Sequence, residues 1–182
     1  LIAYLGIWVI SPKRLFTNNW QDELWLVAGG IFGGSLYFFT ENTALGITQA
    51  SNVSFIICTA PLLTTILSLL FYKSEKASKG LIYGSLLALM GVGLIVFNGS
   101  FVLKISPIGD LLTLLAALSW AFYSLIIKKM AGRYPTVFIT RKIFFYGVLT
   151  ILPAFLLHPL QPDTAVLLQP AVLFNLLFLA VL

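Results

Sequence analysis

Long apolar runs of about 20 residues, separated by short segments that carry most of the charge, constrain this chain more than any other feature. A bilayer core is about 30 Å thick and needs roughly 20 apolar residues of helix to cross it. Of the 182 residues, 59% are hydrophobic and 9% are charged, whereas about a quarter are charged in an average soluble domain. The sequence therefore predicts an all-α, polytopic membrane bundle. It excludes a soluble enzyme, a disulfide scaffold, a coiled coil and a disordered chain.

The runs predict seven membrane spans, five of them complete, at about 24–45, 52–72, 80–98, 107–127 and 136–157. The segment 1–10 would extend only about 15 Å as a helix, and the run that starts near residue 165 is interrupted by the end of the chain. We therefore expect the chain to be a piece of a longer protein.

The basic residues predict the orientation of these spans, because Lys and Arg in short loops stay in the cytoplasm. If the spans alternate in direction, ten basic residues lie on one side and Lys104 alone lies on the other. The sequence thus places the segments around Lys13, Lys76 and Arg133 in the cytoplasm.

Small residues repeat at helical spacing on two of the predicted spans. Gly30, Gly34, Tyr37 and Glu41 share one face of the first complete span, and a second ridge consists of Gly80, Gly84, Ala88 and Gly91. Such ridges let helices approach closely in a membrane, so both are expected to pack against neighbours.

An ordered set of motifs resembles a known family. The segment "ENTALGITQASNVSFIICTAPLLTTILSLLFYKSEKASKGLIYGSLLALMGVGLIVF" looks like the third to fifth helices of an EamA domain of the drug/metabolite transporter (DMT) superfamily. It has the Ala-Leu pair, the small polar turn, the mid-helix proline, the Glu after the fourth helix and the glycine-spaced fifth helix. "SPIGDLLTLLAALSWAFYSLIIKKM" resembles the opening helix of a second EamA domain.

The resemblance implies a ten-helix carrier of two five-helix halves related as an inverted (5+5) repeat. Residues 1–99 would belong to the first EamA repeat, lacking its first helix, and 107–182 to the second, truncated in its third helix. The predicted orientation agrees, because segment 1–10 runs toward the cytoplasm whereas its equivalent five spans later, 136–157, starts there. The family further implies alternating-access transport of a small metabolite across the plasma (inner) membrane, with efflux of an amino acid or a related compound in exchange for protons.

Glu41 is the one acid well inside the pattern of apolar runs. Carboxylates in a membrane are costly and usually functional, so Glu41 is a candidate for substrate binding and for proton coupling, with Tyr37 and Asn42 as neighbours. The alternative is that Glu41, about one turn from the outer end of its helix, simply reaches water.

Other polar or unusual residues within the spans have both a functional and a structural interpretation. Asn52 could contact substrate or, with Ser51, cap a helix N-terminus. Pro61 should kink its helix and is a hinge candidate.

Trp120 and Tyr123 either line a cavity or form hydrogen bonds to another helix. Arg141 and Lys142 are expected to snorkel to the cytoplasmic headgroups, with a gate or an anion contact as the minority interpretation.

No arrangement of residues for catalysis emerges, so we do not expect an enzyme. One cysteine and one histidine offer no Cys/His metal cluster, no cofactor is expected, and there is no nucleotide-binding loop. The expected partners are a small-molecule substrate and the lipid bilayer, not nucleic acid, and a homodimer remains open. Two alternatives stand beside a metabolite carrier: a flippase for a lipid-linked group, and a non-transporting membrane scaffold subunit.

Overall fold

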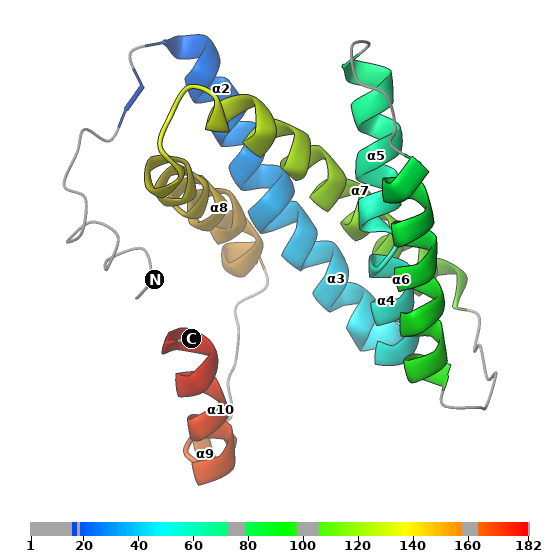
Figure 1. The fold of residues 1–182 in the computed structure, drawn as a ribbon. Coiled ribbons are helices and arrows are strands. Elements are labelled where there is room, and N and C mark those ends of the chain that lie inside the picture. Colours follow the sequence, from blue (N-terminus) through cyan, green and yellow to red (C-terminus); the bar gives the residue numbers. More distant parts are fainter. Residues whose placement is uncertain (1–15, 18, 73–78, 98–105, 158–163, 182) are drawn as a thin grey trace.

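The computed structural model describes residues 16–17, 19–72, 79–97, 106–157 and 164–181, and within these residues all regular structure is helical (Figure 1). The predicted segment 1–10 and the basic residues Lys13, Lys76 and Lys104 lie outside them. In chain order the helices are α2 (Trp20–Gly30), η1 (Ile31–Ser35), α3 (Leu36–Ile47), α4 (Ala50–Ile57), α5 (Ala60–Phe71), α6 (Lys79–Phe97), α7 (Pro107–Ala131), α8 (Thr136–Leu157), α9 (Thr164–Leu167) and α10 (Pro170–Val181). The all-α membrane fold expected from the sequence is confirmed.

The first complete span forms from α2, η1 and α3, which follow one another without a break. Asn19 begins it, because its side chain accepts a hydrogen bond from the backbone N–H of Gln21 at 3.0 Å. The π-helical turn η1 contains Gly33 and Gly34, and a π-turn of this kind often marks a functional site in a helix.

The second span is divided at the predicted proline. The helix α4 ends at Ile57, and α5 begins at Ala60 with Pro61 in its first turn, where the missing N–H of proline costs no helical hydrogen bond. Figure 1 shows α4 and α5 following one another. The expected distortion at Pro61 is therefore present as a break between two helices, and its use as a hinge stays a prediction.

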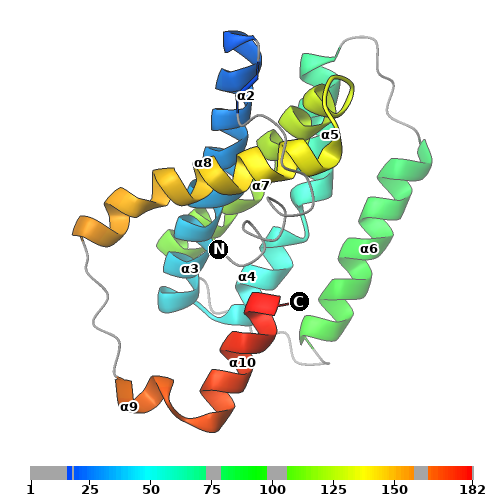
Figure 2. The ribbon, with the colours of Figure 1, turned by 90° about the vertical axis from the view of Figure 1, so that its left-hand side faces the viewer.

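The helix α7 lies at the centre of the bundle and packs against α2, α3, α4 and α5. Alanines at the contact let the helices approach, since Ala116, Ala117 and Ala121 are completely buried. The hydroxyl of Ser119 donates a hydrogen bond to the carbonyl oxygen of Phe32 at 2.7 Å and joins α7 to η1. In Figure 2, α8 crosses this group at a steep angle and contacts α2 and η1.

The glycine face predicted on the first span packs as expected. A Cβ atom added to Gly30 would lie 2.5 Å from the Cβ atom of Tyr146, and one added to Gly34 would lie 2.9 Å from the Cα atom of Gly147. Both contacts are with α8. Only glycine permits the two backbones to come this close, so this ridge holds α8 against α2 and η1.

The second predicted ridge does not pack in the described part of the chain. A Cβ atom added to Gly84 or Gly91 would meet no atom within 4 Å, and Ala88 is exposed. The helix α6 does contact α4 and α5. The prediction that this ridge packs against a neighbour is thus wrong for the helices described, because periodicity identifies a smooth face without identifying what lies against it.

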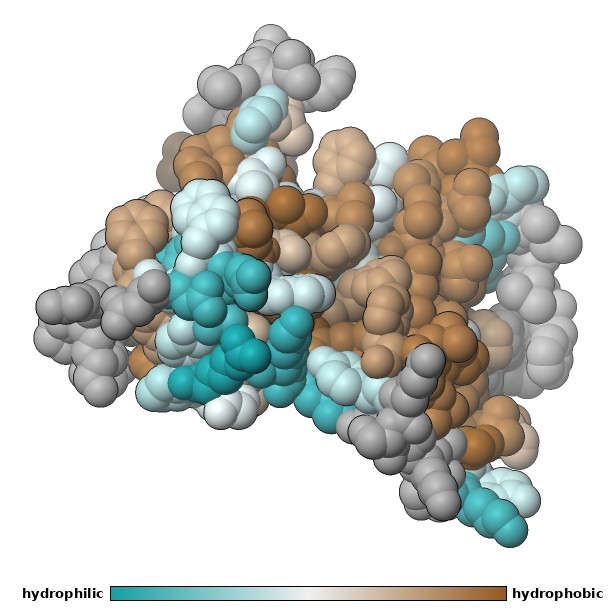
Figure 3. All heavy atoms as spheres, turned by 90° about the horizontal axis from the view of Figure 1, so that it is seen from above, coloured by the Kyte–Doolittle hydropathy of each residue, from teal (hydrophilic) through white to brown (hydrophobic). Residues whose placement is uncertain are grey.

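Within the described residues, three helical segments are long and apolar enough to cross a membrane by length and composition: Ala50–Phe71, Pro107–Ala131 and Thr136–Ala154. The start of α2, the end of α5 and the connection from α7 to α8 lie at one end of the bundle in both ribbon views (Figures 1 and 2). Seen from that end, hydrophilic side chains gather in a patch beside broad apolar surface (Figure 3). This arrangement is what alternating spans with basic segments at one end would produce.

Candidate functional site

Four of the predicted site residues lie together between α3 and α7. The phenol of Tyr37 donates a hydrogen bond to Oε1 of Glu41 at 3.1 Å, one turn further along α3. The ring of Trp120 lies beside both tyrosines, with its centroid 5.0 Å from that of Tyr37 and 5.1 Å from that of Tyr123. We call these four residues the aromatic–acid cluster.

Close packing of α3 and α7 positions this cluster. Ala44 on α3 is fully buried, as are Ala117 and Ala121 on α7, so the two helices meet through small side chains. Gly33 in η1 receives the ring of Tyr123 in the space where a side chain would stand. The cluster therefore depends on η1 as well as on the two α-helices.

The members of the cluster are only partly buried. Trp120 is 39% exposed, and Tyr37, Glu41 and Tyr123 are of intermediate exposure. A carboxylate, two phenols and an indole then present hydrogen-bonding groups next to aromatic faces. This combination suits a small molecule with a polar or cationic group and an apolar part.

The structure does not bring the remaining candidates into the cluster. Asn42 is exposed, and its amide donates a hydrogen bond to the Phe38 carbonyl on its own helix at 2.7 Å. Asn52 is 2% exposed and lies in the first turn of α4. The position before that helix is occupied by Gln49, so the capping role considered for Ser51 and Asn52 is wrong.

A second polar cluster, which sequence reasoning missed, joins the start of α2 to α8. Lys142 and Tyr146 lie one turn apart on α8, with Nζ and the phenol oxygen 3.2 Å apart, and both donate hydrogen bonds to Oε1 of Glu23. The other oxygen of Glu23 accepts hydrogen bonds from Thr17, from its backbone N–H at 2.9 Å and from its hydroxyl at 2.7 Å. We call Glu23, Lys142 and Tyr146 the buried ion-pair cluster.

The burial of Arg141 and Lys142 corrects the expectation that these two side chains snorkel to the headgroups. Arg141 is 1% exposed and Lys142 is fully buried. A buried ammonium needs a nearby carboxylate, and for Lys142 Glu23 supplies it. The sequence hints at this ion pair only by placing Glu23 and Lys142 near the same, cytoplasmic, end of their spans.

Asp22, next to Glu23, makes similar contacts with the turn between α7 and α8. Its carboxylate accepts a hydrogen bond from the guanidinium of Arg133 at 2.5 Å and one from the phenol of Tyr134 at 2.8 Å. The hydrogen bond to Asp22 raises the pKa of Tyr134 above its usual value near 10. The two acids of the first α2 turn thus bind α8 and the turn before it.

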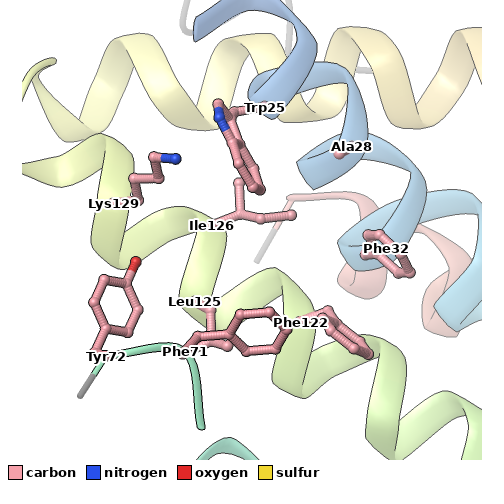
Figure 4. Close-up of a pocket in the computed structure, with 9 residues that line it drawn as sticks. All are labelled: Trp25, Ala28, Phe32, Phe71, Tyr72, Phe122, Leu125, Ile126 and Lys129. Atoms are coloured by element: carbon pink, nitrogen blue, oxygen red, sulfur yellow. The ribbon is translucent and has the colours of Figure 1, made fainter. Parts of the chain in front are cut away.

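An apolar cleft of about 550 Å³ opens at the same end of the bundle, between α2, α5 and α7 (Figure 4). Its walls are mostly aromatic and aliphatic, and one lysine stands at its rim. The lining residues are Trp25, Ala28, Phe32, Phe71, Tyr72, Phe122, Leu125, Ile126 and Lys129. None of the residues predicted to bind substrate lines this cleft.

The two clusters cannot hold a metal ion in the usual way, since no group of three or more His, Cys, Asp and Glu side chains assembles within the described ranges. Both clusters instead place charged and hydrogen-bonding side chains between helices of the bundle. The chain is therefore a multi-pass helical membrane protein with polar groups held between its spans.

Comparison with known proteins identifies the family to which this membrane protein belongs. Residues 1–97 match the model of the EamA-like transporter family, and the chain belongs to that family. The resemblance noted in the sequence is thereby confirmed. No solved structure matches the chain significantly.

The chain is also similar to curated proteins that bear the name "Uncharacterized transporter". One from Archaeoglobus fulgidus is 27% identical over 98% of this chain and 61% of its own length, and a second from the same organism is 25% identical over 86% of this chain and 51% of its own. YdfC of Bacillus subtilis is 32% identical over 73% of this chain and 42% of its own length. The chain therefore spans about two fifths to three fifths of the length of these relatives.

Proposed function

We propose that this protein carries a small polar or amphipathic metabolite across the plasma (inner) membrane by alternating access. Family membership and the transporter names of its relatives support this function. The observation that carries it is the aromatic–acid cluster, because a carboxylate and three hydrogen-bonding rings are held between α3 and α7, and α7 is long and apolar enough to cross a membrane.

Within this proposal, Glu41 and Tyr37 bind the polar group of the substrate, while Trp120 and Tyr123 contact its apolar part. Trp120 is 39% exposed, so part of its ring lies outside the contact between α3 and α7 and is available to a ligand. An amino acid or a related metabolite fits this chemistry, and the direction proposed is efflux.

We further propose that Glu41 couples transport to protons. A proton drives exchange only if two conformations bind it with different affinity. Glu41 accepts a hydrogen bond from Tyr37 and is half-buried, so a conformational change that altered its burial would alter the hydration of the carboxylate.

The ten-helix architecture with two inverted five-helix repeats, 1–99 and 107–182, is part of the same proposal. The support is indirect: the family match ends at residue 97, just before the expected boundary. The helix α7 would then open the second repeat.

Cysteine accessibility in the full-length protein tests the proposed cavity. In a Cys58→Ser background, single cysteines at Glu41, Trp120 and Tyr123 should react with a membrane-impermeant thiol reagent, and added substrate should slow the reaction. Ala116→Cys, at a fully buried position, and Leu115→Cys, at an exposed apolar position on the same helix, serve as matched controls. Labelling of the cluster no faster than these controls would favour the scaffold alternative. Protection by a lipid-linked compound alone would favour the flippase.

A further inference from the structure

We propose that the apolar cleft between α2, α5 and α7 binds one anionic phospholipid of the cytoplasmic leaflet. An acyl chain would lie along the aromatic walls, and the phosphate would lie at the rim beside Lys129. This inference does not depend on the substrate or the direction of transport.

The walls of the cleft suit an acyl chain. Ala28 and Phe32 line one side and Phe122 and Leu125 another, while Phe71 closes the end (Figure 4). From Phe122 to Lys129 the cleft follows α7 for seven residues, about 10 Å of helix axis.

The surroundings of the cleft indicate that its occupant comes from the bilayer. Phe71, which lines the cleft, is 65% exposed, and Leu70, its neighbour in the chain, is 67% exposed. These side chains form an exposed apolar surface at the end of α5. In a membrane that surface contacts lipid tails, so an acyl chain enters the cleft without crossing water.

The positive charge of Lys129 favours a lipid with an anionic headgroup. Nζ of Lys129 lies 3.7 Å from the ring centroid of Trp25, which orients the ammonium at the mouth of the cleft without neutralising it, because the ring carries no net charge. Nζ of Lys128 lies 5.4 Å from the ring centroid of Tyr72 on the other side. Tryptophan and tyrosine are typical of the headgroup level, and the basic residues predict that this end faces the cytoplasm, where anionic lipids are abundant.

The test is native mass spectrometry of the purified full-length protein, exposed to equal amounts of phosphatidylglycerol and phosphatidylcholine with identical acyl chains. The parent protein should retain phosphatidylglycerol about fivefold in preference, as expected for one basic residue next to an anionic lipid. Lys129→Gln should bring the ratio close to one, and Lys129→Arg should preserve it. Lys79→Gln is the matched control, because it removes one exposed positive charge at the start of α6, outside the cleft.

A second variant tests the acyl-chain part of the proposal. Ala28→Phe places a ring inside the cleft and should lower the retention of both lipids several-fold without changing their ratio. The proposal is overturned if Lys129→Gln keeps the preference of the parent, or if a folded Ala28→Phe protein retains as much lipid. Since Lys129 lies at the rim, its variant remains informative even if Ala28→Phe does not fold.

Discussion

Lys142 on α8 donates a hydrogen bond to Glu23 on α2, although the two residues are 119 positions apart in the sequence and the side chain of Lys142 is fully buried. Tyr146 donates to the same carboxylate oxygen. Two charges removed from water stabilise a structure only when each satisfies the other and their remaining hydrogen-bonding atoms also find partners. The buried ion-pair cluster therefore joins α8 to α2, in addition to the close packing at Gly30 and Gly34.

Replacing Lys142 with Met should destabilise the protein by about 3–5 kcal/mol, because Glu23 would then be a buried carboxylate without its cation. The measurement is the unfolding midpoint of the full-length protein in detergent. Lys79→Met is the control, since Lys79 is exposed, and should change the midpoint little.

The double variant Glu23→Gln with Lys142→Met should recover much of the stability lost by Lys142→Met alone, because no buried charge remains. If the double variant were less stable than the single one, the two side chains would not be acting as a pair.

Gly34→Leu should sharply lower the yield of monodisperse protein, because even a Cβ atom there would lie 2.9 Å from the backbone of Gly147. Gly84→Leu is the matched control: a Cβ atom there would meet no atom within 4 Å, and the substitution should leave the yield nearly unchanged. Equal losses for both variants would mean that α6 packs through Gly84 against a part of the protein outside the described residues.

Single cysteines at Gly132 and Ser106 should report opposite sides of the membrane. Gly132 follows α7 and Ser106 precedes it, so a 25-residue helix separates them. In intact cells, an impermeant reagent should label the cysteine at Ser106 and reach the one at Gly132 only after the cells are opened. Labelling of both from outside contradicts the orientation inferred from the basic residues.

Glu41→Gln should abolish the dependence of transport on a pH gradient while leaving substrate counterflow largely intact. The amide keeps the shape of the carboxylate and its ability to accept from Tyr37, but it no longer binds and releases a proton. The measurement is uptake into proteoliposomes with and without an imposed gradient.

Tyr37→Phe is the companion variant, since it removes the hydrogen bond to Glu41 and keeps the acid. It should weaken substrate binding and preserve the response to pH. A Glu41→Gln protein that responds to the gradient as the parent does would identify Glu41 as a solvated acid at the end of a helix.

Several elements of the fold could be predicted from the sequence because they depend on local properties. A bilayer requires about 20 apolar residues for each span, so the runs predict the helices to within a few positions. The break at Pro61 follows from the missing backbone N–H. The cluster of Tyr37, Glu41 and Trp120 was partly predictable, because intramembrane polar residues that share a helix face tend to point inward.

Tertiary structure alone decided which residues meet. The glycine faces of Gly30/Gly34 and Gly80/Gly84 are alike in sequence. Among the described residues, however, Gly30 and Gly34 lie against α8, whereas a Cβ atom on Gly84 would meet no atom within 4 Å. Similarly, Lys142 carries the same charge whether it snorkels or is buried, and the outcome depends on Glu23 arriving beside it from a distant helix. Spacing along one helix determines which side chains share a face. The free energies of packing and of charge burial, in contrast, depend on pairs of helices. The arrangement of two helices is not encoded in the sequence of either helix alone.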